Sequence, residues 1–177
     1  MRRKLAESLP QVETLRGTAE AIPVSDGSLD AVFCAQAFHW FDGDRALAEI
    51  HRVLRPGAGL ALVWNVRDEA VEWERRLSEL LSRYDANAPR KKWGRWKEAF
   101  ERTTLFTPLE EHEFRHTQEG GVETMLARVA SISFIASLPD EERASFLAEV
   151  RALVEPQESP LVMHYRTEVY SCRRLPD

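Results

Sequence analysis

The feature that most constrains the fold is a short apolar run that turns abruptly polar. Residues 29–35 have the sequence Leu-Asp-Ala-Val-Phe-Cys-Ala, which is nearly all apolar and has the length of one strand. Such a run is typical of a strand buried on both faces of a parallel sheet. Polar side chains follow at Gln36 and His39. Because ligands bind at the carboxyl ends of strands in open α/β sheets, we expect the functional site between Ala35 and Asp42.

The next segments complete a strand-helix-strand unit. Apolar residues recur at helical spacing over residues 44–54, and Asp42 or Asp44 can cap the start of this helix. The segment 56–59, Pro-Gly-Ala-Gly, is expected to stop it, and residues 60–65 form a second apolar strand. Connections this short predict a right-handed crossover between two parallel strands.

Patterns in the rest of the chain predict further helices and strands. A basic, tryptophan-containing segment at residues 87–97 is either a solvated lid or a surface that meets an acidic ligand. The other predicted elements are a helix end over residues 1–9, a short strand over 11–16, helices over 69–84, around Phe100, over 122–129 and over 138–154, and strands over 109–118 and 161–173. Helices and strands that are mixed along the chain in this way predict an α/β fold.

Composition argues against several classes of function. The 177 residues carry a net charge of −5 with both signs interspersed, so there is no basic patch to indicate a nucleic-acid partner. No apolar run has the length of a bilayer span or the pattern of a signal peptide, which predicts a cytoplasmic protein without a membrane partner. Cys34 and Cys172 lie in apolar strands and are expected to be free, buried thiols. His112 and His116 lie on a predicted strand and not on a helical face, so no metal site is expected.

Three segments in a fixed order resemble one enzyme family. They are Gly-Thr-Ala-Glu-Ala-Ile-Pro at 17–23, Leu-Asp-Ala-Val and then Ala-Gln-Ala-Phe-His-Trp-Phe within 29–41, and Glu-Ile-x-Arg-Val-Leu-Arg-Pro-Gly at 49–57. The chain thereby resembles the class I S-adenosylmethionine-dependent methyltransferases of the type 11 group. Residues 35–42 look most like the branch that includes trans-aconitate-type and related small-molecule methyltransferases.

The resemblance implies a Rossmann-like α/β fold with a mostly parallel sheet and an antiparallel C-terminal strand. It implies S-adenosylmethionine as the cofactor and a small molecule as the methyl acceptor. It also implies a single partial domain over residues 1–177, in which residues 69–106 form a variable helical lid or insertion. A nucleotide-binding or hydrolase function fits less well, because the chain has no phosphate loop and no Gly-x-Ser-x-Gly elbow.

The chain departs from the family pattern at its start. The family begins with a strand that ends in a Gly-x-Gly-x-Gly loop, and its second strand ends in an acidic residue. Here the only glycines before Leu29 are Gly17 and Gly27. We therefore expect an N-terminally truncated methyltransferase that lacks the first two strands and holds the acceptor side. Alone, such a chain is expected to bind S-adenosylmethionine weakly or not at all.

A second hypothesis is a noncatalytic, methyltransferase-like fragment that pairs with another chain. In the family's strand order, 3-2-1-4-5-7-6, the two missing strands lie between residues 12–16 and residues 29–35. Both segments would then lack those partners. An apolar strand that is exposed at an edge is a template for pairing, so a homodimer through the sheet edge is one expected outcome.

The resemblance also assigns candidate site residues. Those expected to border the cofactor are Thr18, Ala19, Glu20, Ala35, Gln36, Ala37, Phe38, His39 and Trp40. Trp64, Asn65 and Arg67 end the next strand and are expected to face the acceptor. Arg67 would suit an acidic acceptor, and the alternative is a surface arginine. Arg128 and His116 are weaker candidates for the acceptor side.

His39 has three roles open to it. It can be a wall of the cofactor pocket, a general base, or a structural residue that hydrogen-bonds within its loop. Methyl transfer needs a dry cavity and an aligned acceptor, and it needs a base only where the acceptor must lose a proton. A carboxylate acceptor needs no base at all. Trp40 and Phe41 are expected to serve packing more than ligand contact.

Overall fold

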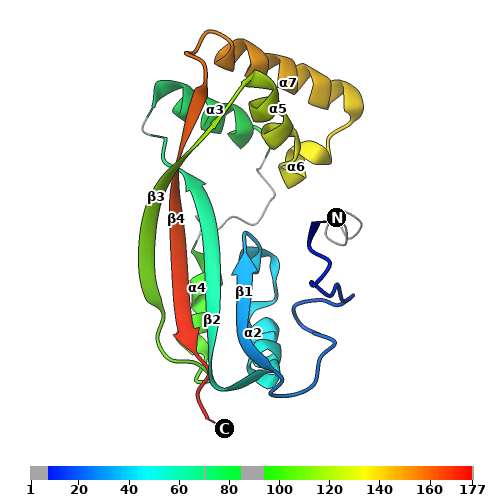
Figure 1. The fold of residues 1–177 in the computed structure, drawn as a ribbon, viewed down its shortest axis with the longest axis vertical. Coiled ribbons are helices and arrows are strands. Elements are labelled where there is room, and N and C mark those ends of the chain that lie inside the picture. The colour runs from blue at the N-terminus through cyan, green and yellow to red at the C-terminus, as the bar shows by residue number, and fades with distance from the viewer. Residues whose placement is uncertain (1–7, 70, 85–93, 177) are drawn as a thin grey trace. The chain divides into compact units, whose positions relative to one another are not determined.

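The computed structural model describes residues 8–69, 71–84 and 94–176, which form two compact units (Figure 1). Unit 1 consists of the described residues of Met1–Leu62, Lys91–Glu110 and Tyr170–Asp177, and unit 2 of those of Val63–Arg90 and Glu111–Val169. The helix end predicted over residues 1–9 and the basic segment 87–97 lie largely outside the described residues. None of the described helices is long and apolar enough to cross a membrane.

Four strands form the sheet, in the order β1-β2-β4-β3. Their bounds are Leu29–Ala35 for β1, Leu54–Arg67 for β2, Glu110–Gly120 for β3 and Leu161–Arg173 for β4. The arrow of β4 points opposite to the other three in Figure 1, so the C-terminal strand β4 is antiparallel to both its neighbours, as the resemblance implies, and the sheet is mixed. The order matches the last four positions, 4-5-7-6, of the order implied by the resemblance. The α/β class is therefore confirmed.

β1 lies at an edge of the sheet, which corrects the expectation that this strand is buried on both faces. Its bounds are those predicted, yet Phe33 is 75% exposed and Cys34 is its one buried residue. An apolar run signals burial only where another layer covers each face of the strand, and the described residues do not cover Phe33. The strand predicted over residues 11–16 does not form.

β2 begins at Leu54, immediately after the preceding helix, although the sequence predicts a stop at residues 56–59. Gly57 adopts a φ of +77°, which a glycine reaches at little cost because it has no Cβ. Its N–H donates to the carbonyl of Arg174 at 3.1 Å, and the N–H of Arg174 donates to the carbonyl of Ala58 at 2.9 Å. Pairing with β4 therefore continues through the predicted break.

The described residues of unit 1 include the helices α2 (Gly43–Val53) and α4 (Arg95–Arg102). The helix α2 lies within one residue of its predicted bounds, and the carboxylate of Asp42 caps it by accepting the N–H of Arg45 at 3.3 Å. The buried face of α2 consists of Ala46, Leu47, Ile50, His51 and Val53. The short helix α4, predicted around Phe100, packs against α2.

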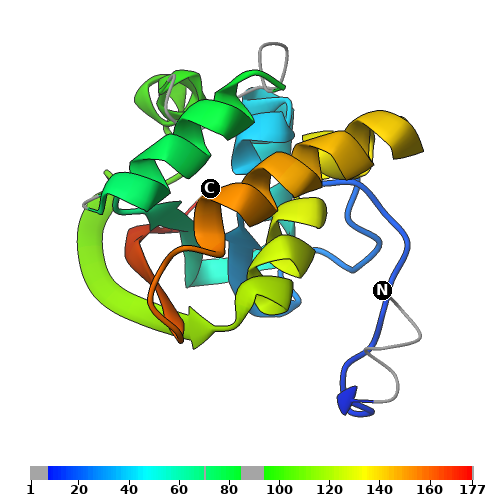
Figure 2. The same ribbon diagram turned by 90° about the horizontal axis from the view of Figure 1, so that it is seen from above.

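Unit 2 is built around a cluster of helices. They are α3 (Glu72–Ser82), α5 (Val122–Ala130), α6 (Ser133–Ala136) and α7 (Asp140–Val154), of which α6 alone was not predicted. Both α3 and α5 pack against α7, and the three helices lie side by side in Figures 1 and 2. Their shared core consists of Trp73, Leu77, Leu81, Met125, Leu126, Val129, Ile135, Phe146, Val150, Leu153 and Val154, together with Leu161, Met163 and Tyr165 of β4.

A buried carboxylate joins α3 to β4 in unit 2. Glu74 is fully buried, and its Oε1 accepts hydrogen bonds from the backbone N–H of His164 at 2.8 Å and from the ring Nδ1 of His164 at 3.1 Å. Burial of a polar group costs free energy unless the group is hydrogen-bonded, so this pair fixes where α3 meets the strand.

Both cysteines are free and buried, as the apolar strands around them predict. Burial raises the pKa of the Cys172 thiol to about 12 and also raises the pKa of Cys34. A thiol that stays protonated is a poor nucleophile, so neither side chain is a candidate for covalent catalysis.

We predict that Phe146→Ala lowers the free energy of unfolding by about 3–5 kcal/mol, because a large buried ring is lost and a cavity remains. Phe146 is 0% exposed, and its ring packs edge-on against Tyr84 with centroids 5.0 Å apart. Chemical denaturation followed by circular dichroism measures the change. The matched control is Phe114→Ala, at a position that is 60% exposed, where the expected change is within about 0.5 kcal/mol. Equal effects of the two substitutions would contradict the proposed core.

Candidate functional site

The loop after β1 contains most of the predicted cofactor residues and starts with an unusual backbone conformation. Gln36 has a φ of +55°, in the left-handed region that non-glycine residues seldom adopt. The 3-10 turn η1 (Phe38–Trp40) follows, and two backbone hydrogen bonds of 2.9 and 3.1 Å close it. Conformations of this kind persist only where the surrounding structure holds them, and they cluster at functional sites.

Phe38 anchors this loop in the core of unit 1. Its side chain is 1% exposed, and its ring centroid lies 5.7 Å from that of Phe41 and 5.3 Å from that of Phe100 on α4. The side chain of Phe38 therefore belongs to the core, and its place beside the cofactor stays a prediction. Its backbone can still border a ligand.

His39 and Trp40 lie at the outer end of the loop. Trp40 is 51% exposed, so half of its surface is open to a ligand while the other half is covered, and its role stays a prediction. The half-buried ring of His39 lies 5.5 Å from that of Trp40, and burial lowers the pKa of His39 below its ordinary value of 6.5. The lowered pKa favours the neutral form of the His39 ring. A neutral imidazole fits each of its three predicted roles, so the choice among them stays open.

Glu20 brings the earlier cofactor segment, Thr18 to Glu20, against the start of α2. Thr18 and Ala21 exchange backbone hydrogen bonds of 3.3 and 3.2 Å, which close a tight turn. The carboxylate of Glu20 accepts the N–H of Asp42 at 3.1 Å. Its own backbone N–H lowers the pKa of Glu20 most, and the N–H of Asp42 lowers it further. The two predicted cofactor segments are thus brought together within unit 1.

Arg52 and Glu49 of α2 hold the segment that follows this turn. Glu49 Oε1 accepts the N–H of Ile22 at 2.7 Å, and the guanidinium of Arg52 donates to the carbonyls of Ile22 and Val24 at 2.9 and 3.0 Å. Arg52 also donates to both carboxylate oxygens of Glu49 and to Asp26. In the sequence, Arg52 stands out only as part of the segment 49–57 that resembles the family. The one local signal of its positioning role is the spacing of three residues from Glu49.

A pH-dependent stability is expected from this network. The hydrogen bond from Arg52, followed by that from the Ile22 backbone, lowers the pKa of Glu49 from 4.5 to about 2. Because the pKa is depressed in the folded state, the stabilisation is complete above about pH 4.5 and is lost as the pH falls toward 2. We predict that Glu49→Gln lowers the melting temperature at pH 7 and that the difference from the wild type shrinks between pH 4.5 and 2.5.

Thermal unfolding followed by circular dichroism across this pH range measures that difference. The matched control is Glu119→Gln, since Glu119 is exposed on β3. A difference between wild type and Glu49→Gln that stays constant from pH 7 to pH 2.5 would show that the carboxylate charge is not what stabilises the loop.

The predicted acceptor residues end β2 and lie in unit 2. Trp64 is 1% exposed, so its side chain belongs to the core and cannot face an acceptor, which corrects that prediction. Asn65 is exposed. Arg67 is half-buried and donates from Nε to the hydroxyl of Ser78 at 3.3 Å, so it is not a surface arginine. Burial lowers the pKa of Arg67.

Asn65 and Arg67 belong to a polar group in unit 2 that we name the Tyr165 cluster. Its members are Asn65, Arg67, His116, Arg128, Tyr165 and Thr167. The ring of His116 stacks on Tyr165 with centroids 5.3 Å apart and planes at 18°, and the Arg128 guanidinium carbon lies 5.2 Å from the centre of the Tyr165 ring. The hydroxyl of Thr167 donates to Asn65 Oδ1 at 2.5 Å.

The Asn65 amide also favours one tautomer of His116. His116 Nε2 lies 3.2 Å from Asn65 Oδ1. Since an amide oxygen accepts, Nε2 carries the hydrogen in the neutral ring, and Nδ1 keeps a lone pair that can accept a proton. His116 is thus a candidate base, although the sequence indicates it only weakly. In the described residues no group of three or more His, Cys, Asp or Glu side chains is arranged to hold a metal ion.

Tyr165 and Thr167 were not among the predicted site residues. The available signal was the alternation of side chains along the last strand, which puts both on one face of β4. Burial raises the pKa of Tyr165, and its hydroxyl donates to the sulfur of Met163 at 3.2 Å. Tyr165 therefore acts as a protonated, apolar floor for the cluster.

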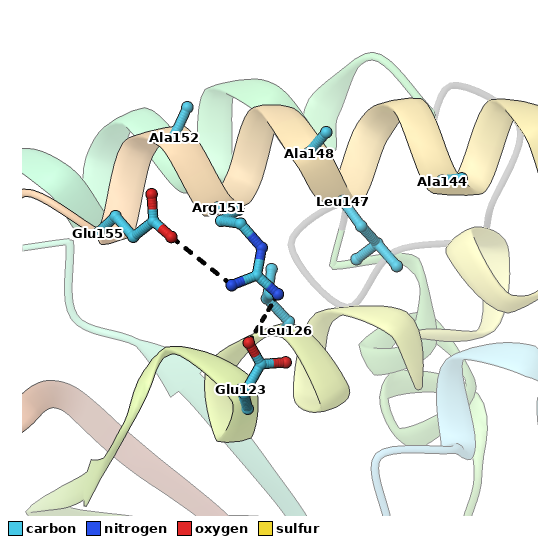
Figure 3. Close-up of a pocket in the computed structure, with 8 residues that line it drawn as sticks. All are labelled: Glu123, Leu126, Ala144, Leu147, Ala148, Arg151, Ala152 and Glu155. Carbon is cyan, nitrogen blue, oxygen red and sulfur yellow. Dashed lines mark ion pairs between the residues drawn. The ribbon is translucent and has the colours of Figure 1, made fainter.

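Two surface grooves of unit 2 contain no residue of either predicted site. One lies between α5 and α7 and is lined by Glu123, Leu126, Ala144, Leu147, Ala148, Arg151, Ala152 and Glu155 (Figure 3). In this groove Arg151 pairs with Glu123 at 2.6 Å and with Glu155 at 3.6 Å, so its charge is already neutralised. The second lies between α3 and α7. We regard both as grooves between packed helices.

Comparison with known proteins identifies the family. A methyltransferase domain family matches residues 1–62. A methyltransferase-like protein of Schizosaccharomyces pombe is 36% identical over 177 residues, which cover 97% of this chain and 69% of that protein. The chain belongs to the methyltransferase family. An uncharacterized methyltransferase of Mycobacterium tuberculosis H37Rv is 41% identical to this methyltransferase chain over 153 residues, or 85% of the chain and 58% of that protein.

Solved structures agree with the family. A protein of Anaeromyxobacter dehalogenans that is described as a type II methyltransferase has a TM-score of 0.63 at 25% identity, covering 97% of this chain and 78% of that one. A Bacillus halodurans protein with a TM-score of 0.51 at 22% identity shows the fold alone. The resemblance to class I methyltransferases, which are enzymes, is confirmed. The trans-aconitate-type branch and the loss of the first two strands stay predictions, as do the activity and partners of the whole protein, since the chain spans 58% of the mycobacterial relative.

Proposed function

We propose that this chain takes part in S-adenosylmethionine-dependent methyl transfer to a small molecule and that it supplies the acceptor-side portion of the enzyme. Membership of the methyltransferase family supports the reaction class. The observation that carries the assignment of the acceptor side is the Tyr165 cluster, because it gathers polar and cationic side chains around the carboxyl end of β2. Ligands in α/β sheets bind at this end of the strands.

The residues of unit 1 fit one wall of a cofactor site. Ala35 and Gln36 are exposed at the end of β1, Ala37 has a small side chain, and half of the Trp40 surface is open. Small side chains let a ligand approach the backbone closely, and an open indole ring offers it an apolar contact. When bound, the cofactor supplies a methyl group on a positively charged sulfur. The 177 residues contain no Gly-x-Gly-x-Gly loop, so this wall is proposed to bind the cofactor weakly.

Side chains of the Tyr165 cluster are proposed to bind the acceptor and, where needed, to remove its proton. The lone pair on His116 Nδ1 suits an acceptor whose reacting atom carries a proton. A carboxylate acceptor would need only to be held in line and kept from water. The neutral His39 ring is proposed to be a wall of the cofactor site.

We predict that Trp40→Ala raises the dissociation constant for S-adenosylmethionine about three- to tenfold, since the loss of one aromatic contact costs about 0.5–1.5 kcal/mol. NMR titration of the chain with millimolar S-adenosylmethionine measures it, and signals of residues 18–20 and 35–40 are expected to shift. Phe114→Ala, at an exposed aromatic position on β3, is the matched control and should leave the constant unchanged. Shifts confined to other residues would refute the proposed wall. A micromolar constant would refute the weak binding expected of an acceptor-side portion.

We further propose, as a second candidate, that the chain pairs with a second copy through β1. The observation that favours pairing is the edge position of β1 together with the 75% exposure of Phe33. An apolar edge strand offers unpaired backbone groups and apolar surface to an identical strand.

For this pairing we predict that light scattering shows a concentration-dependent dimer and that Phe33→Lys converts it to a monomer, because a charge at a strand edge opposes pairing. Phe114→Lys, a charge at a comparably exposed phenylalanine of β3, should leave the dimer intact. A wild-type chain that stays monomeric at high concentration would exclude the second candidate.

A further inference from the structure

The half-buried arginines of this chain fall into two groups. In one group each guanidinium has a carboxylate oxygen within 3.3 Å, and its members are Arg52, Arg143, Arg151 and Arg166. The other group consists of Arg67 and Arg128. In the part of the chain that the structure describes, neither forms an ion pair, and their hydrogen-bond partners are the neutral Ser78 hydroxyl and Gln118 amide oxygen.

Exposure to solvent does not explain why Arg67 and Arg128 form no ion pair. Arg45 and Arg76 also have no ion pair among the described residues, but both are exposed and remain hydrated. Arg67 and Arg128 are partly withdrawn from water, and a charge in that position costs free energy unless a partner of opposite sign is present. The lowered pKa of Arg67 has the same cause, because burial disfavours its charged form.

The two cations also lie around the same ring. The guanidinium of Arg128 faces Tyr165, and Arg67 is near enough to interact electrostatically with both Tyr165 and Arg128. Arg67 also interacts with the carboxylates of Glu69 and Glu74, but neither of these forms an ion pair with it. Two like charges near each other are mutually unfavourable. A guanidinium has five N–H donors, and one on each arginine is used by the neutral partners described above. The remaining donors suit the paired oxygens of an oxyanion.

We infer that the Tyr165 cluster is an oxyanion site, in which Arg67 and Arg128 bind a carboxylate or phosphate group of the methyl acceptor. That the bound anion belongs to the methyl acceptor rests on the proposed function. The anion site itself rests on the two half-buried arginines that form no ion pair. Arg67 and Arg128 are then the residues that determine specificity. They select acidic acceptors over neutral ones of the same shape.

The first test is direct binding, which requires no catalysis. Inorganic phosphate and succinate are titrated into the chain and followed by NMR, with succinamide as the uncharged counterpart of succinate. We expect succinate or phosphate, but not succinamide, to shift the signals of residues 65–67 and 165–167. Whichever of succinate and phosphate binds more tightly identifies the oxyanion as a carboxylate or a phosphate. Arg67→Gln and Arg128→Gln should each weaken binding about tenfold or more, since a hydrogen bond to a charged group contributes about 1.5–3 kcal/mol.

The matched control is Arg76→Gln, which removes an exposed arginine of α3 and should leave binding unchanged. Arg67 and Arg128 lie on different elements, so misfolding of one variant, checked by circular dichroism, leaves the other to decide. Anion binding that survives in whichever variant folds, or that shifts signals elsewhere, would overturn the oxyanion site.

The second test separates this inference from the proposed function. Transfer of labelled methyl groups is measured with pairs of acids and their amides at millimolar S-adenosylmethionine, a concentration that offsets the weak cofactor binding proposed for this chain. A preference for acids of about tenfold or more that falls in Arg128→Gln supports the inference. Equal methylation of acids and amides overturns it while methyl transfer stands. Binding of succinate or phosphate at the cluster without any methyl transfer supports the oxyanion site and overturns the proposed function.

Discussion

The pairing of β2 with β4 is the constraint on which the rest of the structure depends. In unit 1 the N–H of Gly57 donates to the carbonyl of Arg174 at 3.1 Å, and in unit 2 the N–H of Asp68 donates to the carbonyl of His164 at 3.0 Å. Side chains alternate between the faces of a strand, so this register decides that Arg67 shares a face with Tyr165. A slip of one residue would move Arg67 to the opposite face and dissolve the Tyr165 cluster.

Elements that depend on local chemistry were predicted from the sequence. The helix α2 has both its apolar stripe and its cap at Asp42 within a dozen residues, and the strand β4 is rich in β-branched and aromatic residues. The chain order of these elements, with the short motifs around them, was enough to indicate the methyltransferase fold. Hydrophobic periodicity is a property of neighbouring residues, so it can be recognised without knowing the rest of the fold.

Whether a side chain is buried, and which residues gather at a site, depends on distant parts of the chain. These properties were not predicted correctly from the sequence. The sequence of β1 has the apolar pattern of a buried strand, but this pattern does not indicate whether other residues cover Phe33, and the described residues do not. Phe38 and Trp40 are two residues apart, and the 3-10 turn sends one into the core and the other to the surface. His116 meets Asn65 across 51 residues of sequence, a contact that only the register of the sheet determines.

Charge placement, more than net charge, distinguishes the arginines of the Tyr165 cluster. The chain has 29 acidic and 24 basic residues apart from histidine, so carboxylates are in excess overall. Arg166 finds two of them, Glu113 and Glu168, within 3.3 Å. It does so because alternation sends its side chain to the face of β4 opposite Tyr165, while Arg67 on the Tyr165 face donates to a neutral hydroxyl and has no carboxylate within ion-pair distance among the described residues. An acidic chain that still leaves two half-buried cations around one ring indicates an anion site more strongly than a surplus of basic residues would.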